Sequence, residues 1–113
     1  MLQRRRWERC RKELPVVIDQ GGASRIAGTT IDICEGGVGI LCARAFEAGS
    51  RLRFAIADIA DGEMNGIVRW CTSSKTDSGH IVGVELDALS AVHRDALADK
   101  LALWRSQAAD EDG

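Results

Sequence analysis

This sequence of 113 residues lacks several features of membrane, secreted and metal-binding proteins. No apolar run approaches the roughly 20 residues that a membrane-spanning helix needs. The charged start of the chain lacks the apolar segment of a secretory signal. The four cysteines contain no C-x-x-C pair, and neither His80 nor His93 completes a zinc pattern; both histidines are expected on the surface. We therefore expect a cytoplasmic protein, or a cytoplasmic domain of a longer one, with no membrane span and no metal.

Signatures of enzymes and of nucleic-acid-binding surfaces are scarce as well. There is no Walker loop, no G-x-S-x-G motif and no histidine placed for a catalytic triad. The sequence has no tyrosine, and its aromatic residues are three tryptophans and two phenylalanines. Surfaces that stack single-stranded nucleic acid normally expose several aromatic side chains. The composition thus favours a binding module over an enzyme, and argues against a nucleic acid polymer as its partner.

Basic residues are concentrated at the start of the chain. Residues 1–12 hold six basic side chains against the single acidic Glu8, whereas the remainder of the chain is net acidic. A basic arm on an acidic body suits nucleic acid, anionic lipid or a phosphorylated small molecule, although a solvated terminus is the simpler explanation. We assign residues 1–13 to this arm.

Short β-branched and alternating segments, separated by glycine-rich turns, predict strands. Residues 51–57 show this most clearly, because Leu52, Phe54 and Ile56 alternate with Arg51 and Arg53. Six strands are expected, over residues 14–18, 25–33, 38–42, 51–57, 64–71 and 80–86. Short strands at this spacing predict an antiparallel barrel or sandwich, and a closed barrel would remove their exposed edges.

The pattern changes to a helical period after residue 90. Residues 90–107 contain neither glycine nor proline, and Ser90 is placed as an N-cap. One predicted face carries Val92, Leu97, Leu101, Trp104 and Ala108. The expected domain is therefore a β-barrel with a C-terminal helix over residues 14–107, followed by a frayed acidic tail, 108–113.

Two segments carry the candidate chemistry. The first has Arg5 and Arg9 in an R-x-x-x-R spacing, and the second runs Asp32-Ile33-Cys34-Glu35-Gly36-Gly37. An arginine guanidinium binds phosphate oxygens, or O6 and N7 of guanine, through two parallel hydrogen bonds. A carboxylate such as that of Asp32 accepts hydrogen bonds from N1–H and N2–H of guanine, and a glycine turn allows a ligand close to the backbone.

In this order and on this strand pattern, the two segments resemble the PilZ domain, a bacterial receptor for cyclic di-GMP. The family pattern is R-x-x-x-R followed by [D/N]-x-S-x-x-G, which Arg5, Arg9, Asp32 and Gly37 match, while Cys34 stands in place of serine. The resemblance covers essentially the whole chain. It implies a mainly β fold, a six-stranded antiparallel barrel with a C-terminal helix and a flexible basic N-terminal arm.

The resemblance also implies the ligand and the residues that contact it. The ligand is cyclic di-GMP, and no cofactor is expected. The expected ligand-binding residues are Arg4, Arg5, Arg6, Arg9, Asp32, Cys34, Gly36, Gly37 and Trp70. A thiol is a weaker hydrogen-bonding group than a hydroxyl, so Cys34 should weaken binding by about tenfold or less. Trp70 either packs on the barrel or offers its ring to a base.

Three roles remain open at this point. The first is a cyclic di-GMP receptor whose arm orders over the barrel and creates a surface for a downstream protein in motility, polysaccharide export or virulence. The second is an interaction adaptor with the same fold and no ligand, which Cys34 supports. A small nucleic-acid-binding barrel is the third and weakest. The expected assembly is a monomer or weak dimer, and whether one or two nucleotides bind is open.

Overall fold

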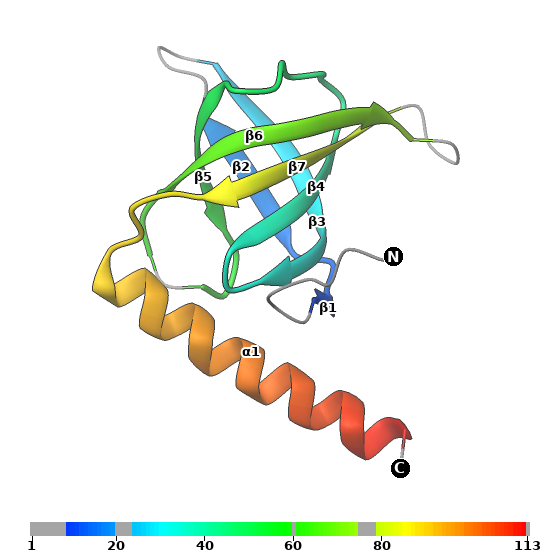
Figure 1. The fold of residues 1–113 in the computed structure, drawn as a ribbon, viewed down its shortest axis with the longest axis vertical. Helices are drawn as coiled ribbons and strands as arrows, with labels where there is room; N and C mark the ends of the chain where they lie inside the picture. Colours follow the sequence, from blue (N-terminus) through cyan, green and yellow to red (C-terminus); the bar gives the residue numbers. More distant parts are fainter. Residues whose placement is uncertain (1–8, 20–23, 60, 75–78, 113) are drawn as a thin grey trace, which may run out of the picture.

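Seven strands and one helix make up the regular structure of the computed structural model, which describes residues 9–19, 24–59, 61–74 and 79–112 (Figure 1). The strands are β1 (Cys10–Arg11), β2 (Pro15–Asp19), β3 (Arg25–Cys34), β4 (Gly37–Cys42), β5 (Arg51–Ile56), β6 (Met64–Ser73) and β7 (His80–Leu86). The helix α1 spans Ala91–Asp112. The six predicted strands are confirmed, with ends shifted by one or two residues.

Strands β2 to β7 close into a barrel. Each is hydrogen-bonded to two neighbours, in the order β3-β2-β5-β6-β7-β4, and the pairing of β4 with β3 completes the ring. Every pairing is antiparallel, as expected for short strands joined by tight turns. Closure leaves none of these six strands with a fully unpaired edge. The predicted six-stranded barrel is therefore confirmed.

Alternating side chains fill the barrel interior. In β5, Leu52, Phe54 and Ile56 are buried, whereas Arg51 and Arg53 face solvent. Burying a side chain of this size contributes about 1.5–3 kcal/mol. The interior side chains form one cluster with three from α1, namely Leu97, Leu101 and Trp104. The helix thus closes one end of the barrel.

The start of α1 corrects two expectations. Ser90 caps the helix as predicted, because its Oγ accepts the backbone N–H of His93 at 3.1 Å. Val92, predicted on the buried face, is 68% exposed, and His93, predicted on the surface, is only 8% exposed. The buried stripe runs back from Leu97 by four residues to His93. The imidazole is satisfied there, with Nδ1 2.9 Å from Ser90 Oγ and Nε2 3.3 Å from the carbonyl oxygen of Gly62.

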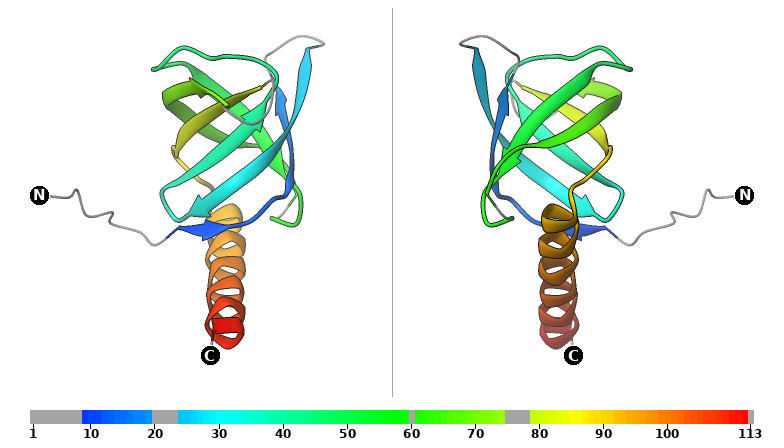
Figure 2. Two further views of the ribbon diagram at one scale, coloured as in Figure 1. Left: turned by 90° about the vertical axis from the view of Figure 1, so that its right-hand side faces the viewer. Right: turned by 90° about the vertical axis from the view of Figure 1, so that its left-hand side faces the viewer.

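The far end of α1 leaves the barrel. The helix continues past its predicted end at residue 107 to Asp112, so the backbone of 108–112, expected to fray, is helical. Figure 2 shows its last turns projecting away from the strands, with β1 lying across its path at the barrel end. The helix up to Arg105 therefore supplies the contacts with the barrel end, and only its last turns project past the strands.

The seventh strand was not predicted. β1 pairs with β3, Cys10 opposite Ile33 and Arg11 opposite Asp32, and Cys10 is buried. The segment expected to be a loose arm up to residue 13 is therefore joined to the barrel from residue 10 onward. Two residues are too few to show an alternation of buried and exposed side chains, so the sequence gives no signal for so short a strand.

Candidate functional site

One row of paired positions crosses the outside of the barrel through five strands. Asp32 of β3 pairs with Arg11 of β1 on one side and with Gly39 of β4 on the other. Gly39 pairs with Gly83 of β7, and Gly83 pairs with Trp70 of β6. An acidic group and an aromatic ring thus stand at the two ends of a pair of glycines.

Two β-bulges turn the end residues outward. The register shifts between Thr30 and Asp32 in β3 and between Val68 and Trp70 in β6. Simple alternation would place Trp70 on the same face as the fully buried Val68, but the bulge at Arg69 reverses this, and Trp70 is 47% exposed. Bulges commonly re-aim side chains in this way next to binding sites.

The two glycines form a floor without side chains. A Cβ at Gly39 would lie 2.9 Å from Asp32 Oδ1, and one at Gly83 would lie 2.2 Å from Cε2 of Trp70. Both distances are too short for real contacts, so the carboxylate and the indole ring lie directly over these positions. A side chain at either position would have to displace the carboxylate or the ring, so glycine at both preserves this close approach.

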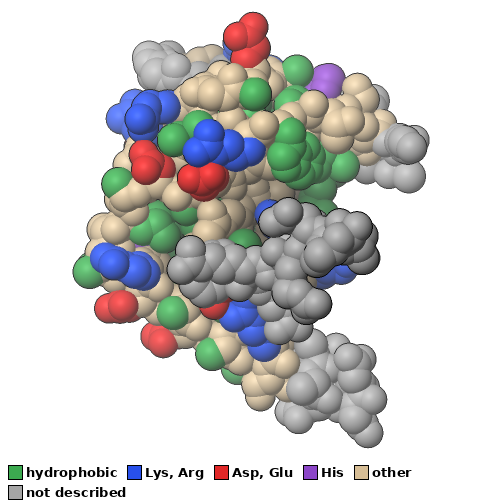
Figure 3. All heavy atoms as spheres, viewed as in Figure 1, with side chains coloured by type: hydrophobic (Ala, Val, Ile, Leu, Met, Phe, Trp, Pro, Cys, Tyr) green, Lys and Arg blue, Asp and Glu red, His purple; other side chains and the backbone are tan. Residues whose placement is uncertain are grey.

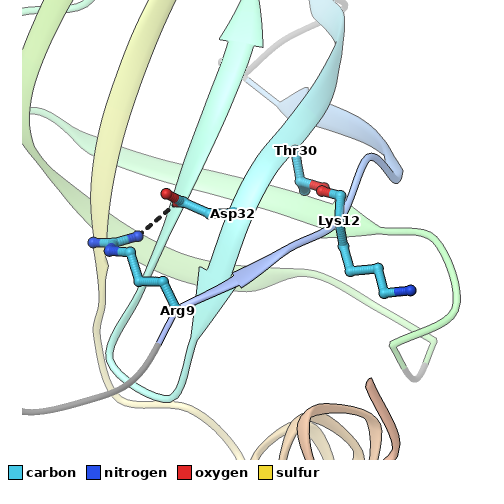
Figure 4. Close-up of polar contacts among 4 residues, drawn as sticks. All are labelled: Arg9, Lys12, Thr30 and Asp32. Atoms are coloured by element: carbon cyan, nitrogen blue, oxygen red, sulfur yellow. Dashed lines mark hydrogen bonds and ion pairs between the residues drawn. The ribbon is translucent and has the colours of Figure 1, made fainter. Parts of the chain in front are cut away.

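Arg9 reaches this row from the chain just before β1. Its Nη1 donates to Asp32 Oδ1 at 2.7 Å, and Figure 4 shows the two side chains pointing toward one another. The two side chains are 28% and 29% exposed, which leaves both accessible to a ligand. A Cβ at Gly37 would lie 3.8 Å from Nη2 of Arg9, so the guanidinium also lies near the start of β4.

The turn between β3 and β4 is fixed from two sides. The carbonyl of Gly36 accepts the N–H of Leu86 at 3.0 Å. Arg105 of α1 donates to both carboxylate oxygens of Glu35, at 2.7 and 2.9 Å. This paired hydrogen bond lowers the pKa of Glu35 and raises that of Arg105. The turn and the helix are therefore held together as one unit.

Cys34 is buried next to this turn. It pairs with Gly37 and by alternation shares the outer face of β3 with Asp32, since the residue between them, Ile33, points into the barrel. It is not part of the barrel's core cluster, although it is only 5% exposed. The thiol thus lies at the site's edge, covered rather than open to solvent.

An exposed ion pair borders the aromatic end of the row. Nε of Arg69 donates to Glu85 Oε1 at 2.8 Å, and Glu85 pairs with Gly37 across β7 and β4. The pairing raises the pKa of Arg69 and lowers that of Glu85. Figure 3 shows basic and acidic side chains in contact on this face. The row therefore has charged groups of both signs near it.

The structure brings part of the predicted site together. Arg9, Asp32, Gly37 and Trp70 lie on one outer face, with Cys34 and Gly36 at the adjoining turn. Arg4, Arg5 and Arg6 lie outside the described residues. The sequence analysis did not identify Gly39 and Gly83 as site residues, although both lie inside predicted strands. Their signal was present, because a glycine inside a strand often marks close approach of another group.

In the ranges that the structure describes, no group of three or more His, Cys, Asp or Glu side chains could hold a metal ion. Over the same residues, no helix combines the length and the apolar character needed to cross a membrane.

The fold and the row together define a small antiparallel β-barrel with a candidate ligand site on its outer wall. The PilZ domain model matches residues 3–103, and the chain therefore belongs to the PilZ domain family. No curated protein matches the sequence.

Solved structures share this fold at low sequence identity. The inhibitor of motility MotI/DgrA from Bacillus subtilis matches with a TM-score of 0.76 and 21% identity, covering 96% of this chain and 53% of that one. The PilZ domain of YcgR from Escherichia coli, with c-di-GMP, has a TM-score of 0.74 and 13% identity, covering 97% and 98%. The MrkH–c-di-GMP complex from K. pneumonia matches with a TM-score of 0.77 and 14% identity, covering 99% of this chain and 57% of that one. The chain thus spans about half the length of MotI/DgrA and of MrkH.

Proposed function

We propose that this protein is a receptor for cyclic di-GMP, and not an enzyme. The observation that carries the proposal is the Arg9–Asp32 pair standing at one end of the glycine floor, with the exposed ring of Trp70 at the other. Family membership and the YcgR and MrkH structures, which contain c-di-GMP, support the choice of ligand. Cyclic di-GMP offers two phosphates for arginine and two guanines for a carboxylate and an aromatic ring.

Each residue has a role in this proposal. Arg9 exchanges part of its contact with Asp32 for phosphate or guanine, and Asp32 accepts N1–H and N2–H of a guanine. Trp70 stacks on a base, which contributes about 1–3 kcal/mol. Gly36 and Gly37 let the ligand approach the backbone, and Cys34 contributes a weak polar contact at the edge. Arg4, Arg5 and Arg6 supply further phosphate contacts.

In this proposal, ligand binding is signalled to other proteins by a change in the N-terminal arm. Ligand contacts order Arg4, Arg5 and Arg6, and the ordering costs about 2–5 kcal/mol of the gross interaction. The ordered arm and the ligand then form a surface for a downstream protein in the cytoplasm. Motility, polysaccharide export and virulence are the candidate outputs.

Calorimetry tests the proposal directly. Wild-type protein is titrated with cyclic di-GMP and, as a control for a linear guanine nucleotide, with GTP. Binding at micromolar or tighter affinity is expected for cyclic di-GMP only, with a large but measurable loss of affinity in Arg5→Ala and in Arg9→Ala. Arg51→Ala is the matched control, because Arg51 pairs with Asp87 on an exposed surface and is not in the row. A wild-type titration without heat rejects the proposal.

The second candidate is an adaptor with the PilZ fold that binds protein partners without the nucleotide. The observation in its favour is Cys34, which replaces the serine of the family pattern and is buried. Titration of Cys34→Ser separates the two functions. Absence of binding in both wild type and Cys34→Ser favours the adaptor, and weak binding that the serine strengthens favours the receptor.

A further inference from the structure

Thr30 is a fully buried polar residue at the bulge of β3. Its hydroxyl accepts the backbone N–H of Leu14 at 2.8 Å and donates to the carbonyl oxygen of Lys12. The backbone N–H of Thr30 also donates to the carbonyl of Leu14 at 2.9 Å. One side chain and its own backbone therefore hold both ends of the tripeptide 12–14.

This tripeptide is where the chain passes from β1 to β2. Both strands pair with the same strand, β3, but β1 pairs with residues 32–33 and β2 with residues 25–29, so the regular ladder is interrupted between them. A backbone N–H buried without a partner costs free energy comparable to a lost hydrogen bond. The Thr30 hydroxyl can satisfy a donor and an acceptor at once, which no apolar side chain of its size can do.

The position of Arg9 depends on this connection. Lys12 follows β1 directly, and its N–H donates to the carbonyl of Ile31 at 3.2 Å. Because the Thr30 hydroxyl bonds to the carbonyl of the same residue, it helps to set the register of Cys10 and Arg11 on β3. A slip of one residue would reverse the faces of all side chains in β1 and the residues before it. Figure 4 shows the result, with Thr30 and Lys12 at one end of the short segment and the Arg9–Asp32 contact at the other.

We propose that Thr30 is a positioning residue for ligand binding: its hydroxyl fixes the chain at residues 12–14 and so holds the Arg9 guanidinium opposite Asp32. Thr30 itself lies inside the barrel and touches no ligand. The consequence for cyclic di-GMP affinity rests on the proposed function, whereas the placement of Arg9 does not.

The first test needs no ligand. Thr30→Val keeps the shape and removes the hydroxyl, Thr30→Ser retains the hydroxyl, and Thr29→Val makes the same change on the outer face of β3. In Thr30→Val, hydrogen-exchange protection of the Leu14 amide should fall at least about tenfold, with that of Val84 unchanged. In wild type, the hydrogen bond to Asp32 should slow the exchange of the Arg9 guanidinium protons with water enough for NMR to detect them. In Thr30→Val, these signals should disappear. Thr30→Ser and Thr29→Val should resemble wild type in both measurements.

The second test uses cyclic di-GMP and a double-mutant cycle. Thr30→Val should weaken binding about five- to tenfold, and Thr30→Ser should restore it. In an Arg9→Ala background, Thr30→Val should cause no further loss, because the side chain that it positions is gone. An equal loss in both backgrounds, or unchanged affinity in Thr30→Val, overturns the positioning role.

The two proposals fail in different ways. If wild type does not bind cyclic di-GMP, the proposed function fails, and the Leu14 and Arg9 signals still decide the role of Thr30. Unchanged Leu14 protection and Arg9 signals in Thr30→Val overturn the inference even where the ligand binds. If Thr30→Val does not fold, one glycine inserted between Glu13 and Leu14 shifts Arg9 while leaving Thr30 intact. That insertion should reduce affinity to the level of Arg9→Ala, and wild-type affinity would overturn the inference.

Discussion

At the residue scale, Gly83 is the position with the sharpest steric requirement in the proposed site. A Cβ there would lie 2.2 Å from Cε2 and 2.3 Å from Nε1 of Trp70, so Gly83→Ala must displace the indole ring. Because the ring is half exposed, it can move without disturbing the core. We expect about tenfold weaker binding of cyclic di-GMP and a shift in tryptophan fluorescence, with little change in melting temperature.

The matched control for Gly83→Ala is the same change in a Trp70→Ala background. No ring is then left to displace, so the second substitution should have no further effect on affinity. A loss of the same size in both backgrounds would show that the glycine acts independently of Trp70.

Cys34 gives a second prediction at this scale. Cys34→Ser should raise the affinity for cyclic di-GMP by up to about tenfold, because a hydroxyl forms stronger hydrogen bonds than a thiol. The same change should lower the free energy of unfolding by about 1 kcal/mol, because the side chain is buried and a hydroxyl is costlier to desolvate. Calorimetry measures the first effect and urea denaturation the second. Unchanged affinity would mean that residue 34 makes no ligand contact.

The residues of the candidate site were easier to propose from the sequence than their arrangement in space. Arg9, Asp32 and Gly37 follow from motif spacing, and the structure places them on one face. The orientation of Trp70 could not be predicted, because the bulge at Arg69 leaves no mark in the alternation of hydrophobic and polar residues. Thr30 was read as an ordinary strand residue, since its importance comes from contacts with a segment 16 to 18 residues earlier.

At the scale of elements, the ion pair between Glu35 and Arg105 joins the β3–β4 turn to α1. The pKa of Glu35 is lower in the folded protein than in the unfolded chain, mainly through its hydrogen bonds with Arg105. This pair therefore stabilises the folded state above the unfolded pKa of about 4.5, and the stabilisation is lost as pH falls through the lower folded value. Because both side chains are partly exposed, the effect is about 1 kcal/mol or less.

Glu35→Gln provides the test of this pH dependence. As pH falls below about 4.5, wild type should lose stability more steeply than Glu35→Gln, as followed by thermal unfolding at a series of pH values. Glu85→Gln is the comparison variant, because Glu85 bonds to Arg69 within the barrel and not to the helix. That pair is more exposed, so its removal should change the slope less than Glu35→Gln does. The interpretation fails if Glu35→Gln and wild type show the same slope.

Long periodic elements were predictable and short or irregular ones were not. The strand around Phe54 shows a clear alternation of hydrophobic and polar residues. The helix was predictable from a long stretch without glycine or proline, but its hydrophobic face is weak, and Val92 was therefore placed on the wrong side. β1 has two residues and forms only because β3 offers a free edge beside it. The burial of His93 depends on a carbonyl from residue 62, which no local pattern reveals.

At the scale of the whole molecule, stability comes mainly from the single core that the barrel and α1 share. Phe54 is fully buried at its centre, so Phe54→Ala should lower the free energy of unfolding by about 3–5 kcal/mol in urea denaturation. Such a loss is a large fraction of the 5–15 kcal/mol typical of a domain. Phe46→Ala is the control, because Phe46 is only partly buried against the core and should cost less than half as much. Equal losses would contradict the shared core.

Helix α1 contacts two segments that border the proposed ligand site: the segment that follows Arg9 and the β3–β4 turn. The ammonium group of Lys12 lies 5.5 Å from the ring centre of Trp104, and Arg105, the next residue, holds Glu35. A protein that docks on α1 and alters these two contacts would change nucleotide affinity by some factor. Thermodynamic linkage then requires the nucleotide to change the affinity for that protein by the same factor. Through the neighbouring side chains Trp104 and Arg105, one helix would thus couple nucleotide binding to protein binding, and protein binding to nucleotide binding.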